Sequence, residues 1–193
     1  VIGGSSADGN RRDTVYFADI LPDGTVSAWM TTTSLPEVRE DFEAVVWNGF
    51  VYVLGGSTTG GVYLDTILYA QIQSDGTLGD WMATTSLPTT VAGYASVLWN
   101  GRIYVIIGGW PGWKGEVYYA VINSDGSIGD WNPTSSLPQP RRAPAVAVRN
   151  DVIYVIGGQY PSTVYHSTVY YANVNPDGSV GAWSTTTSIP TNI

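Results

Sequence analysis

Short apolar runs alternate with turn residues along the chain, and the pattern is clearest between residues 42 and 103. In order, this stretch holds an apolar run at 44–47, Asn48-Gly49, a run at 51–54, Gly55-Gly56, a loop, a run at 67–72, Asp75-Gly76 and a segment with Trp81. Asn-Gly and Asp-Gly between apolar runs favour tight hairpins, because these residues accept a positive φ. The pattern predicts a four-stranded antiparallel meander, whose strands we call a to d.

This unit recurs four times. Gly-Gly pairs lie 52, 53 and 49 residues apart, at Gly3-Gly4, Gly55-Gly56, Gly108-Gly109 and Gly157-Gly158, and one tryptophan follows each pair at Trp29, Trp81, Trp131 and Trp183. Such periods predict one supersecondary unit per repeat that buries its apolar face against its neighbours. We expect a single region, 1–193, with repeats of about 1–49, 50–101, 102–151 and 152–193. The third unit has one extra residue before its Gly-Gly pair, which predicts a bulge at Ile106-Ile107.

Composition supports a chain of many strands and tight turns. The 193 residues include 23 Gly and 11 Pro, and aromatic and charged residues each make up 12%. The formal net charge of -8, with Lys114 as the one lysine, argues against nucleic-acid binding, which depends on clustered basic residues. No apolar run approaches the ~18 residues of a membrane span. Without cysteine, disulfides and thiolate metal sites are excluded.

The residues of each unit resemble the kelch family of β-propellers. Asp125-Gly126, Gly129, Trp131 and Ser136-Leu137-Pro138 form the series found in bacterial kelch-like repeats and in the central domain of galactose oxidase. Tyr-Val-hydrophobic-Gly-Gly also recurs from Tyr52, Tyr104 and Tyr154. The resemblance covers the whole chain and implies an all-β, kelch-type β-propeller with four-stranded antiparallel blades.

The resemblance also implies where ligands bind. In such propellers strand a lines a central channel, and the b–c and d–a loops emerge together on one face. Here the b–c loops are 57–66, 110–116 and 159–167, and the d–a loops are 37–42, 89–94 and 139–144. Variation concentrated on one face of a repeat scaffold is typical of a binding surface.

Strand a is expected in three units only, at 42–47, 94–99 and 144–149. An open propeller exposes sheet edges, which natural sheets avoid. Two interpretations follow: the chain is a segment of a longer protein with more blades, or a partner chain supplies the missing blades.

Three charged residues are candidates for the channel mouth. Arg39 and Arg141 occupy equivalent positions before strand a, where Val91 stands in the intervening unit, and could hold an anionic group. The alternative is that they cap loops or pair with a neighbouring carboxylate or blade. Glu43 replaces Ala95 and Ala145 on strand a, which predicts either a ligand-binding carboxylate or a solvated channel carboxylate.

Aromatic residues of the b–c loops are the other candidates. Trp110 and Trp113 in the third unit suggest a stacking platform for a sugar ring, extended by Tyr160 and His166, or else side chains that fold over the blade edge. The repeated Trp29, Trp81, Trp131 and Trp183 are expected to pack between blades.

These features predict a non-catalytic binding or adhesion module of a secreted or cell-surface protein, with a glycan or protein ligand and no metal or cofactor. One histidine and no cysteine exclude the copper chemistry of galactose oxidase within this chain. The alternative is a sugar-modifying enzyme that resembles the sialic acid mutarotases of the family, which use arginines and carboxylates near the channel mouth.

Overall fold

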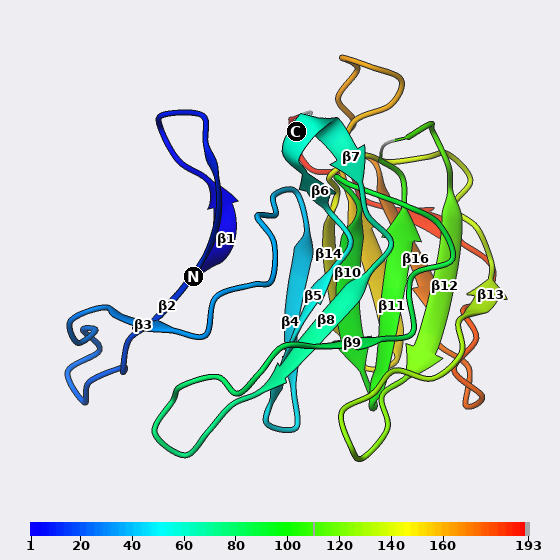
Figure 1. The fold of residues 1–193 in the computed structure, drawn as a ribbon. Helices are drawn as coiled ribbons and strands as arrows, with labels where there is room; N and C mark the ends of the chain where they lie inside the picture. The colour runs from blue at the N-terminus through cyan, green and yellow to red at the C-terminus, as the bar shows by residue number, and fades with distance from the viewer. Residues whose placement is uncertain (110, 192–193) are drawn as a thin grey trace.

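The computed structural model describes residues 1–109 and 111–191 and consists of short antiparallel strands. Within these residues four sheets follow one another along the chain, and we call them blades 1 to 4 (Figure 1). In hydrogen-bonded order they contain β1 (Ile2–Ser5), β2 (Arg11–Phe17) and β3 (Met30–Thr32); β4 (Glu43–Trp47), β5 (Phe50–Leu54), β8 (Ile67–Gln71) and β9 (Met82–Thr84); β10 (Ala95–Trp99), β11 (Arg102–Ile107), β12 (Glu116–Val121) and β13 (Asn132–Thr134); and β14 (Ala145–Arg149), β15 (Val152–Ile156), β16 (Val169–Asn173) and β17 (Ser184–Thr186). The predicted all-β architecture of four meanders is confirmed, and blade 1 has three strands.

The a–b turns are as tight as the sequence predicts. Both central residues of each turn have positive φ, as tight hairpins require: Asn48 and Gly49, Asn100 and Gly101, and Asn150 and Asp151. In blade 2 the resulting register pairs Trp47 with Phe50 beside the turn and Glu43 with Leu54 at the far end. Glu43 therefore lies at the end of the blade that carries the b–c and d–a loops. Between β5 and β8 that end also holds the small hairpin of β6 (Ser57–Thr58), the 3₁₀ helix η1 (Thr59–Gly61) and β7 (Val62–Tyr63).

The Gly-Gly pairs let the d–a loops of neighbouring blades approach the end of strand b. A Cβ on Gly55 would lie 3.0 Å from the Val91 carbonyl of the following loop, and one on Gly56 would lie 2.5 Å from the Glu40 carbonyl of the preceding loop. The Gly56 amide donates a hydrogen bond of 2.9 Å to Val91. Each pair thus fixes two d–a loops to one blade, which explains why glycine recurs there.

The predicted bulge at Ile106-Ile107 is wrong. Six consecutive pairs join β11 to β12 without a shift, ending with Ile107 opposite Glu116. The extra residue lengthens both strands, so the ladder continues instead of bulging. A register shift occurs in blade 1, between Ile2 and Gly4.

The buried core lies between blades. One cluster joins blades 1 and 2, a second joins blades 2 and 3, and a third joins blades 3 and 4. Trp81 and Trp183 lie at these contacts, and their indole N–H groups donate to carbonyls of the preceding blade at 3.0 and 2.7 Å. Trp131 packs in the same way with its indole nitrogen unpaired. Trp29 differs from the predicted packing role: its side chain is 56% exposed, because no described sheet covers that side of blade 1.

Candidate functional site

The two ends of the blades differ in how many polar groups remain available. At one end, each Asp-Gly turn is closed by its own carboxylate, which accepts hydrogen bonds from the amide and hydroxyl two residues later. The four pairs are Asp23 with Thr25, Asp75 with Thr77, Asp125 with Ser127 and Asp177 with Ser179. These bonds lower the pKa of each aspartate below its ordinary value of 3.8. The carboxylates of this end are therefore used within the turns.

At the other end the three d–a loops surround a hollow, and we call this end of the molecule the loop face. The loops hold equivalent residues with positive φ, and hydrogen bonds join them in series, from the Ala143 amide to the Gly93 carbonyl at 2.8 Å and from the Gly93 amide to the Asp41 carbonyl at 3.5 Å. The hollow has a volume of about 340 Å³. It is lined by Asp41, Phe42 and Glu43, by Gly93 and Tyr94, and by Ala143 and Pro144. We call it the mouth pocket.

Glu43 is the titratable group that this pocket perturbs most. Burial raises its pKa to about 7, and the nearby Ser96 hydroxyl offsets the shift only in part, since it makes no regular hydrogen bond. The fully buried Tyr94 hydroxyl donates to the Leu54 carbonyl at 2.7 Å, and burial raises its pKa well above the ordinary value. At neutral pH the pocket thus offers a carboxyl group that can either donate or accept a hydrogen bond.

The structure assigns Arg39 to the scaffold and not to the pocket. Its side chain is 0% exposed. One Nη atom donates to the carbonyls of Gly55 and Thr66 at 3.1 and 2.9 Å, and the other donates to the Thr66 hydroxyl and the Glu37 carboxylate at 2.9 and 2.8 Å. This corrects the ligand-binding role expected from the sequence, because the guanidinium joins a d–a loop to blade 2 and presents no surface to a ligand.

Arg141 is a scaffold residue of the same kind at the next contact. It is 1% exposed and lies over the Tyr170 ring, 5.1 Å from its centroid. Its guanidinium donates to the Pro140 carbonyl at 2.8 Å and to the Gln139 side chain and the Tyr170 hydroxyl at 3.3 Å. Burial lowers the pKa of Arg141, with the Tyr170 hydroxyl as a partial offset. Its expected role as a ligand contact is corrected in the same way.

The cation that the structure does place at the loop face is Arg142, which the sequence analysis missed. Its side chain is half-buried and donates to the Gln159 side chain at 3.3 Å. A Cβ on Gly93 would lie 3.2 Å from Arg142 Nε, so this glycine leaves room for the arginine. Arg142 lines a second hollow of about 220 Å³ with Ala143, Gly158, Gln159 and Tyr165. Since Ala143 borders both hollows, they form one continuous polar tract.

Aromatic side chains flank this tract. Trp113 meets the Tyr160 ring edge-on, with centroids 5.5 Å apart and planes at 77°. His166 lies beside them, with Nε2 2.5 Å from the Tyr160 carbonyl, and Tyr165 is exposed. The structure thus brings Trp113, Tyr160 and His166 together as the sequence suggested. Trp110 lies outside the described residues.

Two structural searches add little to this geometry. Among residues 1–109 and 111–191, no group of three or more His, Cys, Asp and Glu side chains gathers at a possible metal site. In the same part of the chain, no helix has the length and apolar character needed to cross a membrane.

No protein-family profile matches the chain, whereas two known proteins do resemble it. Kelch repeat and BTB domain-containing protein 1 of ectromelia virus (strain Moscow) is 30% identical over 77 residues, which are 40% of this chain and 13% of the viral protein. The solved structure of YjhT matches with a TM-score of 0.72 and 14% identity, over 98% of this chain and 65% of that one. The chain therefore spans only part of both. Together with the four antiparallel sheets, these likenesses identify a kelch-repeat β-propeller fold.

Proposed function

We infer that this chain is a non-catalytic binding module that recognises a glycan or a polar segment of a protein through its loop face. The observation that carries this proposal is the contrast between the two ends of the blades. The loop face combines an open polar tract with exposed aromatic rings, whereas the Asp-Gly end uses its carboxylates in its own turns. A concave site with a few convergent polar groups beside aromatic surface is typical of ligand pockets.

A sugar fits this surface well. The rings of Trp113 and Tyr160 offer apolar surface against which the C–H face of a pyranose can lie. Glu43 and Arg142 could then bind its hydroxyl or carboxylate groups. We propose that this recognition serves adhesion at the cell surface or outside the cell, with further blades from the same longer chain or a partner chain completing the channel.

A glycan array followed by calorimetric titration tests the proposal. We expect Trp113→Ala, Arg142→Ala and Glu43→Gln each to weaken the selected glycan about tenfold, which corresponds to ~1.4 kcal/mol. The matched control is Asp125→Ala at the opposite end, which should leave the affinity unchanged. Full affinity in all three loop-face variants would contradict the site.

The state of Glu43 favours one second candidate, a sugar-modifying enzyme. A carboxyl group with a pKa of about 7 is suited to general acid–base catalysis at neutral pH, and it lies in a hollow large enough for part of a sugar. Proton NMR of free reducing sugars would detect accelerated anomer exchange. If the protein accelerates exchange and Glu43→Gln does not, the enzyme replaces the binding module.

A further inference from the structure

Neighbouring blades are joined by a repeated set of hydrogen bonds. Threonines at the end of strand d bond the backbone amide and carbonyl of the residue that follows the Asp-Gly-Thr/Ser turn in the next blade, at 2.6 to 3.1 Å. The sets are Thr32 and Thr33 with Leu78, Thr84 and Thr85 with Ile128, and Thr134 with Val180. A strand-b tyrosine adds a bond to the turn glycine of the next blade, from Tyr52 to Gly126 and from Tyr104 to Gly178.

The same contacts repeat an apolar arrangement. The residue between Ser and Pro after strand d lies in one buried cluster with a paired valine and aliphatic or aromatic residue of its own blade or the next. The three sets are Leu35 with Val53 and Leu68, Leu87 with Val105 and Tyr118, and Leu137 with Val155 and Tyr170. One face of each blade thus carries the tyrosine, threonines and apolar knob, and the other carries the turn and the apolar hole.

Blade 4 presents the first kind of face without a partner. Thr186 and Thr187 are exposed, and no hydrogen bond joins their hydroxyls or that of Tyr154 to any described residue. The Tyr154 ring stacks on Tyr171 as its counterparts in blades 2 and 3 stack on theirs. Ile189 takes the position of Leu137, and its amide bonds the Ser167 carbonyl at 3.0 Å, as the Leu137 amide bonds Gly115. The face therefore has the same conformation as the three that are covered.

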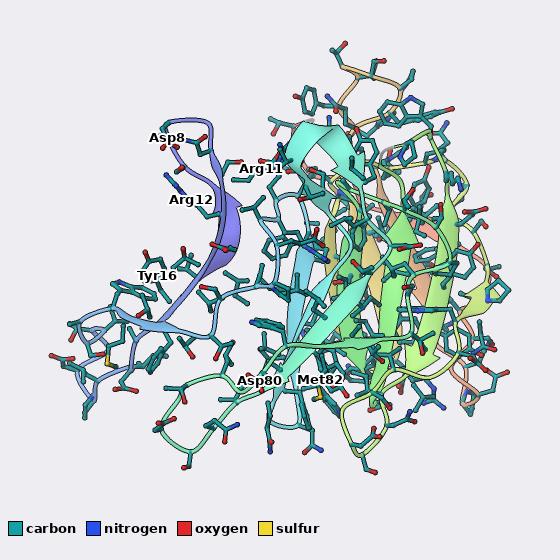
Figure 2. All side chains as sticks on the ribbon, in the orientation of Figure 1. Asp8, Arg11, Arg12, Tyr16, Asp80 and Met82 are labelled. Atoms are coloured by element: carbon teal, nitrogen blue, oxygen red, sulfur yellow. The ribbon has the colours of Figure 1, made fainter. Side chains whose placement is uncertain are left out.

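Blade 1 presents the complementary face, also uncovered. Val26 stands where Ile128 and Val180 are buried, and it is 51% exposed. Trp29, the counterpart of Trp183, is exposed as well. Val1 and Tyr16 pair as Val155 and Tyr170 do, and they line a hollow of about 420 Å³ with Gly3, Ser6, Arg12 and Thr14. Figure 2 shows Arg12 and Tyr16 on the side of blade 1 that faces away from blade 2.

We propose that two copies of this chain associate head to tail, with blade 4 of each copy seated on blade 1 of the other. Ile189 fills the hollow beside Val1 and Tyr16, the Thr186 and Thr187 hydroxyls bond the backbone of Val26, and the Trp29 indole donates to a carbonyl near Thr187. The occupant is a second copy because the chain already forms this contact three times, so its two free faces are continuous with an interface it is known to make.

Head-to-tail contacts produce a ring when the rotation closes and a filament when it does not. Two four-bladed copies give a ring of eight blades, within the range of about four to eight found in propellers. Both contacts form in the same dimer, so the second is intramolecular once the first exists and gains from a high effective concentration. This association is independent of the ligand that the loop face binds.

Sedimentation over a concentration series tests the dimer. We expect a species of twice the chain mass of 20.7 kDa, and a single 20.7 kDa species throughout would overturn the proposal. Trp29→Arg and Ile189→Asp should each give monomers, and Tyr154→Phe should weaken association while leaving its ring in place. Val62→Asp, an equally drastic change at an exposed position of β7, is the control and should leave the dimer intact.

Mixing the two monomeric variants gives the sharpest test. Trp29→Arg damages only the receiving face and Ile189→Asp only the inserting face, so a mixture retains one intact contact per pair. A heterodimer should therefore appear on mixing, with each variant's circular dichroism unchanged from the parent. If the mixture stays monomeric while both variants are folded, or if either variant alone dimerises like the parent, the head-to-tail contact is refuted.

Discussion

Replacement of Arg39 should destabilise the fold, because its guanidinium joins the loop before β4 to the end of blade 2. Arg39→Ala would remove the donors that now satisfy the carbonyls of Gly55 and Thr66. The same change would end the hydrogen bonds to the Thr66 hydroxyl and to the Glu37 carboxylate. The prediction concerns stability, since the side chain has no exposed surface that a ligand could contact.

The magnitude follows from these partners. A buried carbonyl that loses its donor costs about 1 to 3 kcal/mol. Gly55 pays this in full, whereas Thr66 O still accepts the Gly55 amide at 3.1 Å and loses less. The ion pair adds under about 1 kcal/mol, because the Glu37 side chain is 42% exposed. Removal of a buried cation also relieves part of its desolvation cost, so the expected loss is about 2 to 4 kcal/mol.

Matched denaturant melts of the parent, Arg39→Ala, Arg39→Met and Arg12→Ala measure this loss. Arg39→Met keeps most of the side-chain volume, so its loss should reflect the missing hydrogen bonds alone. Arg12 pairs with Asp8 at the surface, and its alanine variant should cost under about 1 kcal/mol. The scaffold role would be refuted if Arg39→Ala were as stable as Arg12→Ala and instead abolished binding of the loop-face ligand.

Two further changes test other parts of the structure. Trp81→Ala should cost about 2 to 4 kcal/mol in the same melts, since it removes a half-buried indole and its bond to Thr33, while Trp29→Ala in the isolated protomer should cost under about 0.5 kcal/mol. For Glu43, a folded pKa of about 7 above the ordinary 4.5 means that the native state holds its proton more tightly than the unfolded chain. Its contribution to stability is therefore complete below pH 4.5 and declines as the pH rises to about 7, so Glu43→Gln should flatten that part of the stability–pH curve; an unchanged slope would contradict the burial of the carboxyl.

The sequence predicts the fold well because local chemistry determines most of it. The positive φ that Asn48-Gly49 and its counterparts accept determines the hairpins, and the apolar runs between them determine the strands. The bulge at Ile106-Ile107 was predicted wrongly because a residue count in one strand does not reveal its partner. The extra residue of β11 is matched by one in β12, and this pairing depends on the length of the intervening loop.

The site is harder to predict, because it depends on side-chain direction. Arg39 and Arg141 are equivalent by sequence and near the channel, but their side chains turn between blades toward carbonyls that Gly-Gly pairs bring close. Arg142 was missed because its counterparts, Glu40 and Ala92, share no property with it. Only the joined positions of the d–a loops show that it lies over Gly93 beside the mouth pocket.

These outcomes separate residues that repeat from residues that do not. Where a residue type recurs in every blade, as with the turn aspartates and Gly-Gly pairs, the structure uses it in the scaffold. The mouth pocket and its neighbour hold the exceptions: Glu43 against Ala95 and Ala145, and Arg142 against Ala92. A scaffold that needs alanine-sized groups at a strand end gains no stability from a buried carboxyl there, since burial opposes its ionisation. The retention of charge at two adjoining non-repeating positions is therefore better explained by a ligand than by the fold.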